Sequence, residues 1–189
     1  MGLFDKLQSQ MPQQENSSPQ PVQEGTFTFT FSELPENLEQ LRALPESTLD
    51  TPYKTAALAL CALCCYAVDR ENGARMLEFL RGPKGALSAY DAQFLRDRLS
   101  GQQYVPFSYF EGALPENDYR PDVPYKITFC SDPYSFANEG YAKLNVRSGG
   151  ADSPRQIQLR TKPSTGEWFL WEQFILVGIR VPVAANPWA

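Results

Sequence analysis

Residues 52–68 read PYKTAALALCALCCYAV, and this stretch decides the fold. Pro52 suits the first helical position, and Asp50 or Thr51 can cap the helix in front of it. Apolar residues recur at helical spacing and also fill the remaining sides of the predicted helix. A helix that is apolar all round is buried, because it has no polar face to turn to water. We therefore expect a central helix that the rest of the chain covers.

Three of the four cysteines lie within this helix, in the segment CALCC at residues 61–65. Three interpretations are open: part of a metal site, a redox pair, or buried core. Structural zinc takes four ligands, and only Cys130 remains as a fourth sulfur in a chain without histidine. A redox C-x-x-C motif acts at a helix N-terminus, whereas this one lies mid-helix among alanine and leucine. The sequence therefore favours buried, reduced and metal-free cysteines.

The composition limits the classes of function. The formal net charge is −5, so phosphate backbones repel the chain and we expect no nucleic-acid partner. The chain has no histidine, which excludes a Ser-His-Asp or Cys-His mechanism and removes the commonest metal ligand. We accordingly expect no cofactor, no metal and no assignable catalytic residue.

The first 25 residues are rich in Gln, Pro, Ser and Glu, and we expect them to form a disordered tail. They lack the charged and apolar regions of a secretory signal. The longest apolar stretch, 56–68, has 13 residues, which is too short to span a bilayer. The expected compartment is the cytoplasm, where cysteines stay reduced.

Residues 26–189 are expected to form a single α+β domain. Residues 26–31, TFTFTF, alternate with the period of a half-buried strand. The domain then divides into three parts, which are a helical part at 33–101, an irregular part at 102–124 and a β part at 125–182. Connections between the C-terminal strands are too short for parallel crossovers. We predict an antiparallel C-terminal meander sheet with the helical part packed on one face, and its strands at 125–130, 141–147, 155–162 and 168–177.

Four cations mark the second and third of these C-terminal strands, namely Lys143, Arg147, Arg160 and Lys162. Apolar residues alternate with them, so all four are expected on the outward face of the sheet. The face is either an ordinary solvated surface or a site for an acidic partner protein or a small anion. Arginine offers paired donors to carboxylate or phosphate, which favours binding through Arg147 and Arg160 on neighbouring strands.

The register of this hairpin follows from its turn. If the seven-residue turn 148–154 closes the hairpin, Leu144 lies opposite Gln158 and Ala142 lies opposite Arg160. A bulge in so long a turn would shift this pairing by one or two residues.

Two further features carry weaker signals. The turn SGGADSP, residues 148–154, is either an anion-binding nest of backbone amides or a plain hairpin loop. Glu116, Asp118, Asp122 and Glu139 lie among tyrosines, and paired carboxylates can serve glycoside hydrolysis or bind a hard cation. Their spacing matches no known pattern of either kind.

The segments LSAYDAQFLRDRL, PENDYRPDVPY, SGGADSPRQIQLR and WFLWEQ resemble a family of uncharacterised proteins from Gram-positive gut bacteria, a domain of unknown function. The resemblance covers residues 26–189. It implies one compact domain in a bacterial cytoplasm, and it implies no activity, cofactor or catalytic residue.

The sequence thus predicts a non-enzymatic cytoplasmic domain that binds an acidic partner or an anionic ligand through the basic sheet face. The alternative is a histidine-free hydrolase that uses the loop carboxylates and tyrosines. A flat, basic, aromatic surface would favour the first hypothesis, and a deep acidic pocket would favour the second.

Overall fold

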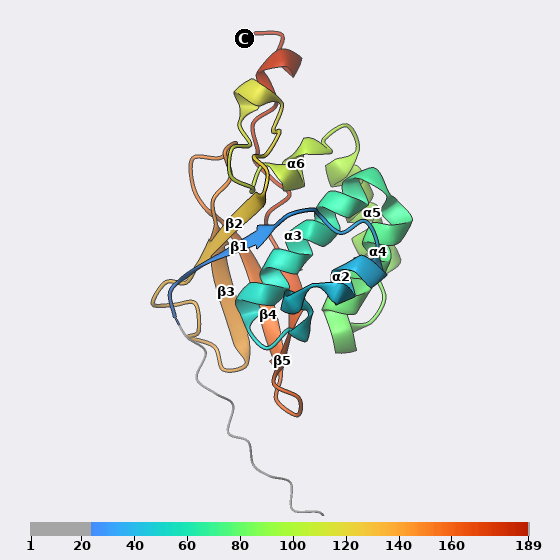
Figure 1. The fold of residues 1–189 in the computed structure, drawn as a ribbon, viewed down its shortest axis with the longest axis vertical. Helices are drawn as coiled ribbons and strands as arrows, with labels where there is room; N and C mark the ends of the chain where they lie inside the picture. Colours follow the sequence, from blue (N-terminus) through green and yellow to red (C-terminus); the bar gives the residue numbers. More distant parts are fainter. Residues whose placement is uncertain (1–23, 189) are drawn as a thin grey trace, which may run out of the picture.

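The computed structural model describes residues 24–188 and places helix α3, Pro52–Val68, at the centre of the molecule (Figure 1). Thr51 caps the helix, because its side chain accepts a hydrogen bond from the Lys54 amide. Asp50 instead pairs with the Lys54 ammonium at 2.8 Å. The predicted all-round burial is confirmed, since 14 of the 17 helical residues are buried.

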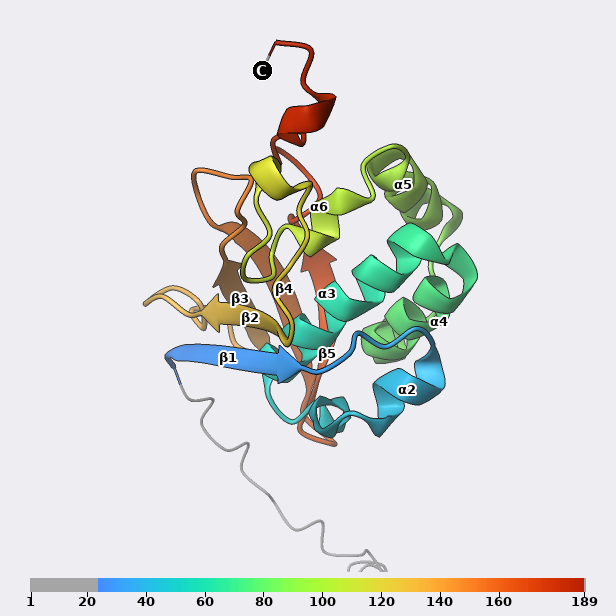
Figure 2. The ribbon, with the colours of Figure 1, turned by 45° about the horizontal axis from the view of Figure 1, so that its top comes forward.

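Five strands form one antiparallel sheet in the order β1-β2-β3-β4-β5, and α3 contacts every strand. The predicted α+β class, with a meander sheet and helices on one face, is therefore confirmed (Figure 2). The N-terminal strand joins the sheet as a fifth strand, at the edge beside the first strand of the meander. The strands are β1 Thr26–Phe31, β2 Tyr125–Cys130, β3 Tyr141–Val146, β4 Arg155–Lys162 and β5 Glu167–Gln173.

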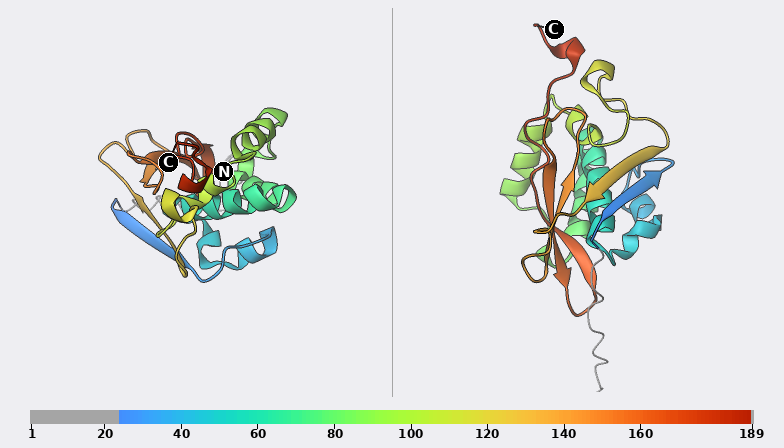
Figure 3. Two further views of the ribbon diagram at one scale, coloured as in Figure 1. Left: turned by 90° about the horizontal axis from the view of Figure 1, so that it is seen from above. Right: turned by 90° about the vertical axis from the view of Figure 1, so that its left-hand side faces the viewer.

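The sheet curls because its middle is weakly joined. Strands β1 and β2 pair over all six residues, but β2 and β3 pair only at Phe129↔Val146 and Cys130↔Asn145. The β1–β2 pair is thus free to turn away from the other three strands, as the side view shows (Figure 3). This curl wraps the inner face of the sheet around α3.

The helical layer lies between β1 and β2 in the chain. Its helices are α2 Leu38–Ala43, α3, α4 Arg70–Arg81, α5 Ala89–Leu99 and the short α6 Tyr104–Phe107. Helix α5 begins with a capping box, in which Ser88 and Asp91 bond each other's backbone amides. None of the helices within residues 24–188 is both long and apolar enough to cross a membrane.

Two predicted boundaries change. Strand β5 ends at Gln173 and not at residue 177, because Ile175 and Leu176 are both buried and so break the alternation of a strand. The Ile175 carbonyl accepts a hydrogen bond from the Tyr109 hydroxyl, and this bond holds the segment against the helical layer. At the other end, Gly25 already bonds Ser131 through both its amide and its carbonyl. Residues 1–23 of the predicted tail lie outside the described residues.

The cysteines of α3 belong to the core. Cys61 and Cys64 are 0% and 2% exposed, and burial raises the pKa of both thiols. Burial, followed by the nearby Asp69 and Glu36 carboxylates, raises the pKa of Cys65 to about 11. No group of three or more potential metal ligands was found among the residues that the structure describes.

We predict that thiol reagents distinguish these cysteines from Cys130, which is half-buried on β2. At pH 8, a maleimide should modify Cys130 of the folded protein, and it should modify Cys61 and Cys64 only after unfolding. The reason is that their thiols are both inaccessible and protonated. Peptide mapping by mass spectrometry reads out each site. Rapid modification of Cys61 or Cys64 in the folded chain would contradict their placement.

The contact between α3 and α4 depends on one glycine. Gly73 of α4 lies so close to α3 that an added Cβ would overlap the backbone of Tyr66. Backbone atoms cannot rotate away as a side chain can, so the two helices would have to separate. The close approach therefore requires a residue without a side chain at this position.

We predict that Gly73→Ala destabilises the protein even though alanine is the better helix former. Helix propensity favours alanine by about 1 kcal/mol, whereas forcing an extra carbon into a packed contact costs about 1–3 kcal/mol or more. Urea denaturation should therefore show a lower free energy of unfolding for Gly73→Ala. Arg75→Ala is the control, because Arg75 is an exposed residue of the same helix. It should change the free energy of unfolding by less than about 0.5 kcal/mol. Equal or higher stability of Gly73→Ala would refute the packing argument.

Candidate functional site

The register of the β3–β4 hairpin fixes where the four predicted cations lie. Leu144 pairs with Ile157 and Ala142 with Leu159, so the predicted pairing is wrong by one residue. The reason is that inward residues of both strands lie directly opposite one another and share the core. Lys143, Arg147, Arg160 and Lys162 are all exposed, and the alternation of buried and exposed residues places them on the outward side, as expected.

The same register separates the two arginines. Arg160 lies opposite Tyr141 at the start of β3, whereas Arg147 follows the last residue of that strand. With about 3.3 Å per strand residue, the length of the hairpin lies between them. Lys143 and Lys162 are each two residues from the Tyr141–Arg160 pair, so three of the four cations lie toward one end.

Arg160 belongs to an aromatic cluster on this end of the sheet. Its guanidinium carbon lies 4.8 Å from the ring centre of Trp171 and 5.4 Å from that of Tyr141. The two rings meet edge to face, with centres 5.8 Å apart. The cluster thus joins β3, β4 and β5 and holds the guanidinium against aromatic faces.

A second cation reaches the same tryptophan from the helical layer. Lys84 ends the 3₁₀ turn η2, Gly82–Lys84, and its ammonium lies 4.7 Å from the Trp171 ring centre. The ammonium also donates a 2.5 Å hydrogen bond to the Trp171 carbonyl. Partial burial, and then the charge of Arg81, lowers the pKa of Lys84. Two positive charges therefore converge on one indole ring.

These residues line a cavity of about 450 Å³, which we call the basic lobe. All four charged residues in its lining are basic, and the lining contains no carboxylate. Among residues 24–188, no ion pair includes Lys84, Arg160 or Lys162. The basic lobe is lined by Arg81, Pro83, Lys84, Arg160, Thr161, Lys162, Pro163, Phe169, Leu170 and Trp171.

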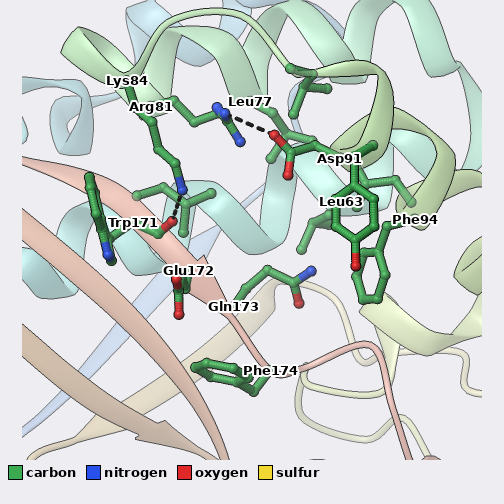
Figure 4. A pocket seen from close by; sticks show the side chains of 14 residues that line it. Leu63, Leu77, Arg81, Lys84, Asp91, Phe94, Trp171, Glu172, Gln173 and Phe174 are labelled. Atoms are coloured by element: carbon green, nitrogen blue, oxygen red, sulfur yellow. Dashed lines mark hydrogen bonds and ion pairs between the residues drawn. The ribbon is translucent and has the colours of Figure 1, made fainter.

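The fourth basic residue, Arg81, has a structural partner. Its side chain is nearly buried, and it pairs with Asp91 at 3.0 Å (Figure 4). It also donates to the carbonyls of Gly85 and Ala86. Burial tends to raise the pKa of Asp91, but hydrogen bonds from Ser88 and the Arg81 charge outweigh it and lower that pKa. Arg81 thus fixes the loop that carries Lys84.

The position of this loop against β5 depends on Gly82. Its φ of +47° lies in the left-handed region that only glycine adopts at low cost, and an added Cβ would overlap the Phe169 ring. The loop can therefore lie directly on β5. This contact brings Lys84 to Trp171 from a segment far away in the sequence.

A second cavity, of about 360 Å³, adjoins the basic lobe, and we call it the apolar lobe. The two lobes share Arg81, Lys84, Leu170 and Trp171 as walls. Figure 4 shows the apolar lobe between the Arg81–Asp91 pair and the segment from Trp171 to Phe174. Its apolar lining consists of side chains from α3, α4, α5, β5 and the loops beside them, namely Leu63, Leu77, Leu87, Tyr90, Phe94, Leu95, Leu170, Trp171 and Phe174.

The weaker candidates do not gather into a site. Glu116, Asp118, Asp122 and Glu139 are exposed, and none lines either lobe. In the SGGADSP turn, the second and third amides already donate to Ser108 and Ser148. An added Cβ at either glycine of this turn would overlap protein atoms, so the glycines allow close packing of the turn. These contacts favour the plain hairpin loop over an anion nest.

Sequence reasoning missed Lys84 and Trp171. Lys84 is 87 residues from Trp171 in the chain, and no local pattern links them. One signal was present in Gly82-Pro83, which ends a helix and so turns the following lysine toward the sheet.

Comparison with known proteins places the chain in a family. No curated protein and no solved structure matches it. Residues 33–183, well over half of the chain, match the model of a family described as a domain of unknown function, DUF6935. The matched region includes the helical layer, β2 to β5 and both lobes. The chain therefore belongs to the family Domain of unknown function (DUF6935).

Proposed function

We propose that this protein is a non-enzymatic binding domain that takes a small anion, or an acidic side chain of a partner protein, in the basic lobe. The observation that carries the proposal is the sign of the charges, since all four charged residues lining this lobe are basic. The chain as a whole carries −5. A concentration of positive charge in an acidic protein attracts anions to that place.

The environment of each cation supports the proposal further. Lys84 donates to a carbonyl and Arg160 lies on aromatic rings, so neither positive charge is neutralised by an ion pair within residues 24–188. A bound anion would supply the missing charge. The positive charge of Arg81 lowers the pKa of Lys84, and a bound anion would oppose this by favouring the charged ammonium.

The lobe is also suited to a planar or multidentate anion. Arg160 offers a fork of donors beside the indole of Trp171, and Lys162 extends the basic side along β4. A volume of about 450 Å³ is within the usual range for small-molecule sites. Lys143 lies on the same face, two residues from Tyr141, and contributes to the positive potential.

We propose the cytoplasm as the setting. All four cysteines are free thiols, and Cys61 and Cys64 are buried. Reduced thiols are the normal state in that compartment.

The proposal predicts that Arg160→Ser weakens anion binding and that Arg147→Ser does not. The probe is inorganic pyrophosphate at low ionic strength, measured by isothermal titration calorimetry. Loss of one cation–anion contact in a partly buried site should raise Kd about tenfold. Lys84→Ser should have a similar effect. The affinity of the unmodified protein should fall as salt is added.

Arg147→Ser is the matched control, because it removes the same charge from the same sheet face at the far end of the hairpin. Thermal melts of Arg147→Ser and Arg160→Ser should agree within a few degrees, since exposed charges contribute little to stability. Equal weakening by Arg147→Ser and Arg160→Ser would mean that only the overall charge matters. An unchanged Kd in Arg160→Ser would reject the basic lobe as the site.

A further inference from the structure

The apolar lobe is a second compartment of the same site, with a different chemistry. Its lining contains two cations and two carboxylates, and Arg81 is paired with Asp91, whereas Lys84 has no ion-pair partner among residues 24–188. Its interior is formed by leucine and phenylalanine side chains. The site thus changes from basic to apolar across a single wall, where Lys84 and Trp171 belong to both lobes.

Two aromatic side chains beside the apolar lobe are strongly exposed. Tyr90 is 79% exposed and Phe174 is 50% exposed, and both line the cavity. Large exposed aromatics beside a cavity are typical of surfaces that a ligand covers. Together with the buried leucines, they provide apolar contact from the opening to the floor.

The edge of β5 excludes an extended peptide as the occupant. The Trp168 amide donates to the Leu49 carbonyl, and the Trp168 carbonyl accepts the Thr55 hydroxyl, both at 2.7 Å. The Trp171 carbonyl accepts a hydrogen bond from the Lys84 ammonium. Because an added strand needs a row of free backbone groups, this edge does not offer one.

We propose that the ligand is a monocarboxylic acid with an apolar chain, whose carboxylate lies against Lys84 and whose chain fills the apolar lobe. This inference rests on the proposed anion-binding function and names its ligand class. Charge complementarity places the acid at the wall between the lobes, because Lys84 has no ion-pair partner among residues 24–188 and the basic lobe beyond it contains no carboxylate. The apolar lining then stabilises the chain by removing it from water.

The test is a series of straight-chain acids, hexanoate, octanoate and decanoate, titrated into the full-length protein below their aggregation limits. Each added pair of methylenes should lower Kd, by about fourfold for every methylene that is fully buried. Octanamide, which has the same length without the charge, should bind at least tenfold more weakly than octanoate. Equal affinity across the series, or equal affinity for octanoate and octanamide, would overturn the inference.

Leu87→Trp provides the variant control, because Leu87 lies in a half-exposed loop position and a larger side chain there fills the apolar lobe. It should abolish the chain-length dependence and leave pyrophosphate binding unchanged, which also shows that the variant folds. Persistence of that dependence would overturn the inference. If pyrophosphate binds to Arg160→Ser as tightly as to the unmodified protein, the proposed function is rejected instead. Binding to phosphatidylglycerol vesicles without binding of free octanoate would mean that this surface contacts a membrane. That result would overturn the inference that the ligand is a free acid.

Discussion

The burial of one helix governs the rest of this structure. Helix α3 has no polar face, so water must be excluded from it on every side. The curled sheet covers it along five strands, and α4 covers it at a distance that only Gly73 permits. Removing this much apolar surface from water is the main favourable contribution to folding. The positions of the five strands, α4, α6 and the 3₁₀ turn η1, Pro45–Thr48, follow from how these elements cover α3.

The basic lobe and the apolar lobe are a consequence of that arrangement. The helical layer extends past the sheet at β5, the last strand, and its loops meet the edge of that strand. Thr55 and Lys84 bond two backbone carbonyls of β5, so the edge is closed by side chains of the helical layer. The apolar lobe lies between the helical layer and β5, and the basic lobe adjoins it on the outward side of the sheet. The site therefore lies where the η2 turn of the helical layer meets the edge strand of the sheet.

Much of the fold could be predicted because its signals are local and periodic. The TFTFTF strand, the PYKTAALALCALCCYAV helix and the Ser88 capping box each follow from spacing within a few residues. The alternation of buried residues also placed Lys143 and Arg160 on the outward face. The register was wrong by one residue, because a long turn does not fix which residues lie opposite each other.

The candidate site was predicted only in part, and for a physical reason. Arg160 and Lys162 were identified from charge and parity along one strand. Lys84 and Trp171 come together through the contact of Gly82 with Phe169, which no periodicity encodes. Conversely, Arg147 satisfied the same sequence rule as Arg160 but lies at the other end of the hairpin. Position along a strand, and not orientation alone, decides which charges act together.

The central claim is that an anion binds beside Trp171, and the indole N–H signals of the three tryptophans test it directly. Trp168 is buried on the inner face, and Trp188 is 93% exposed near the C-terminus. In a ¹H–¹⁵N NMR titration with pyrophosphate, with the signals assigned by Trp→Phe substitution, the Trp171 signal should shift in a saturable manner. The signals of Trp168 and Trp188 should stay in place. A saturable binding event that leaves the Trp171 signal unmoved would contradict the account.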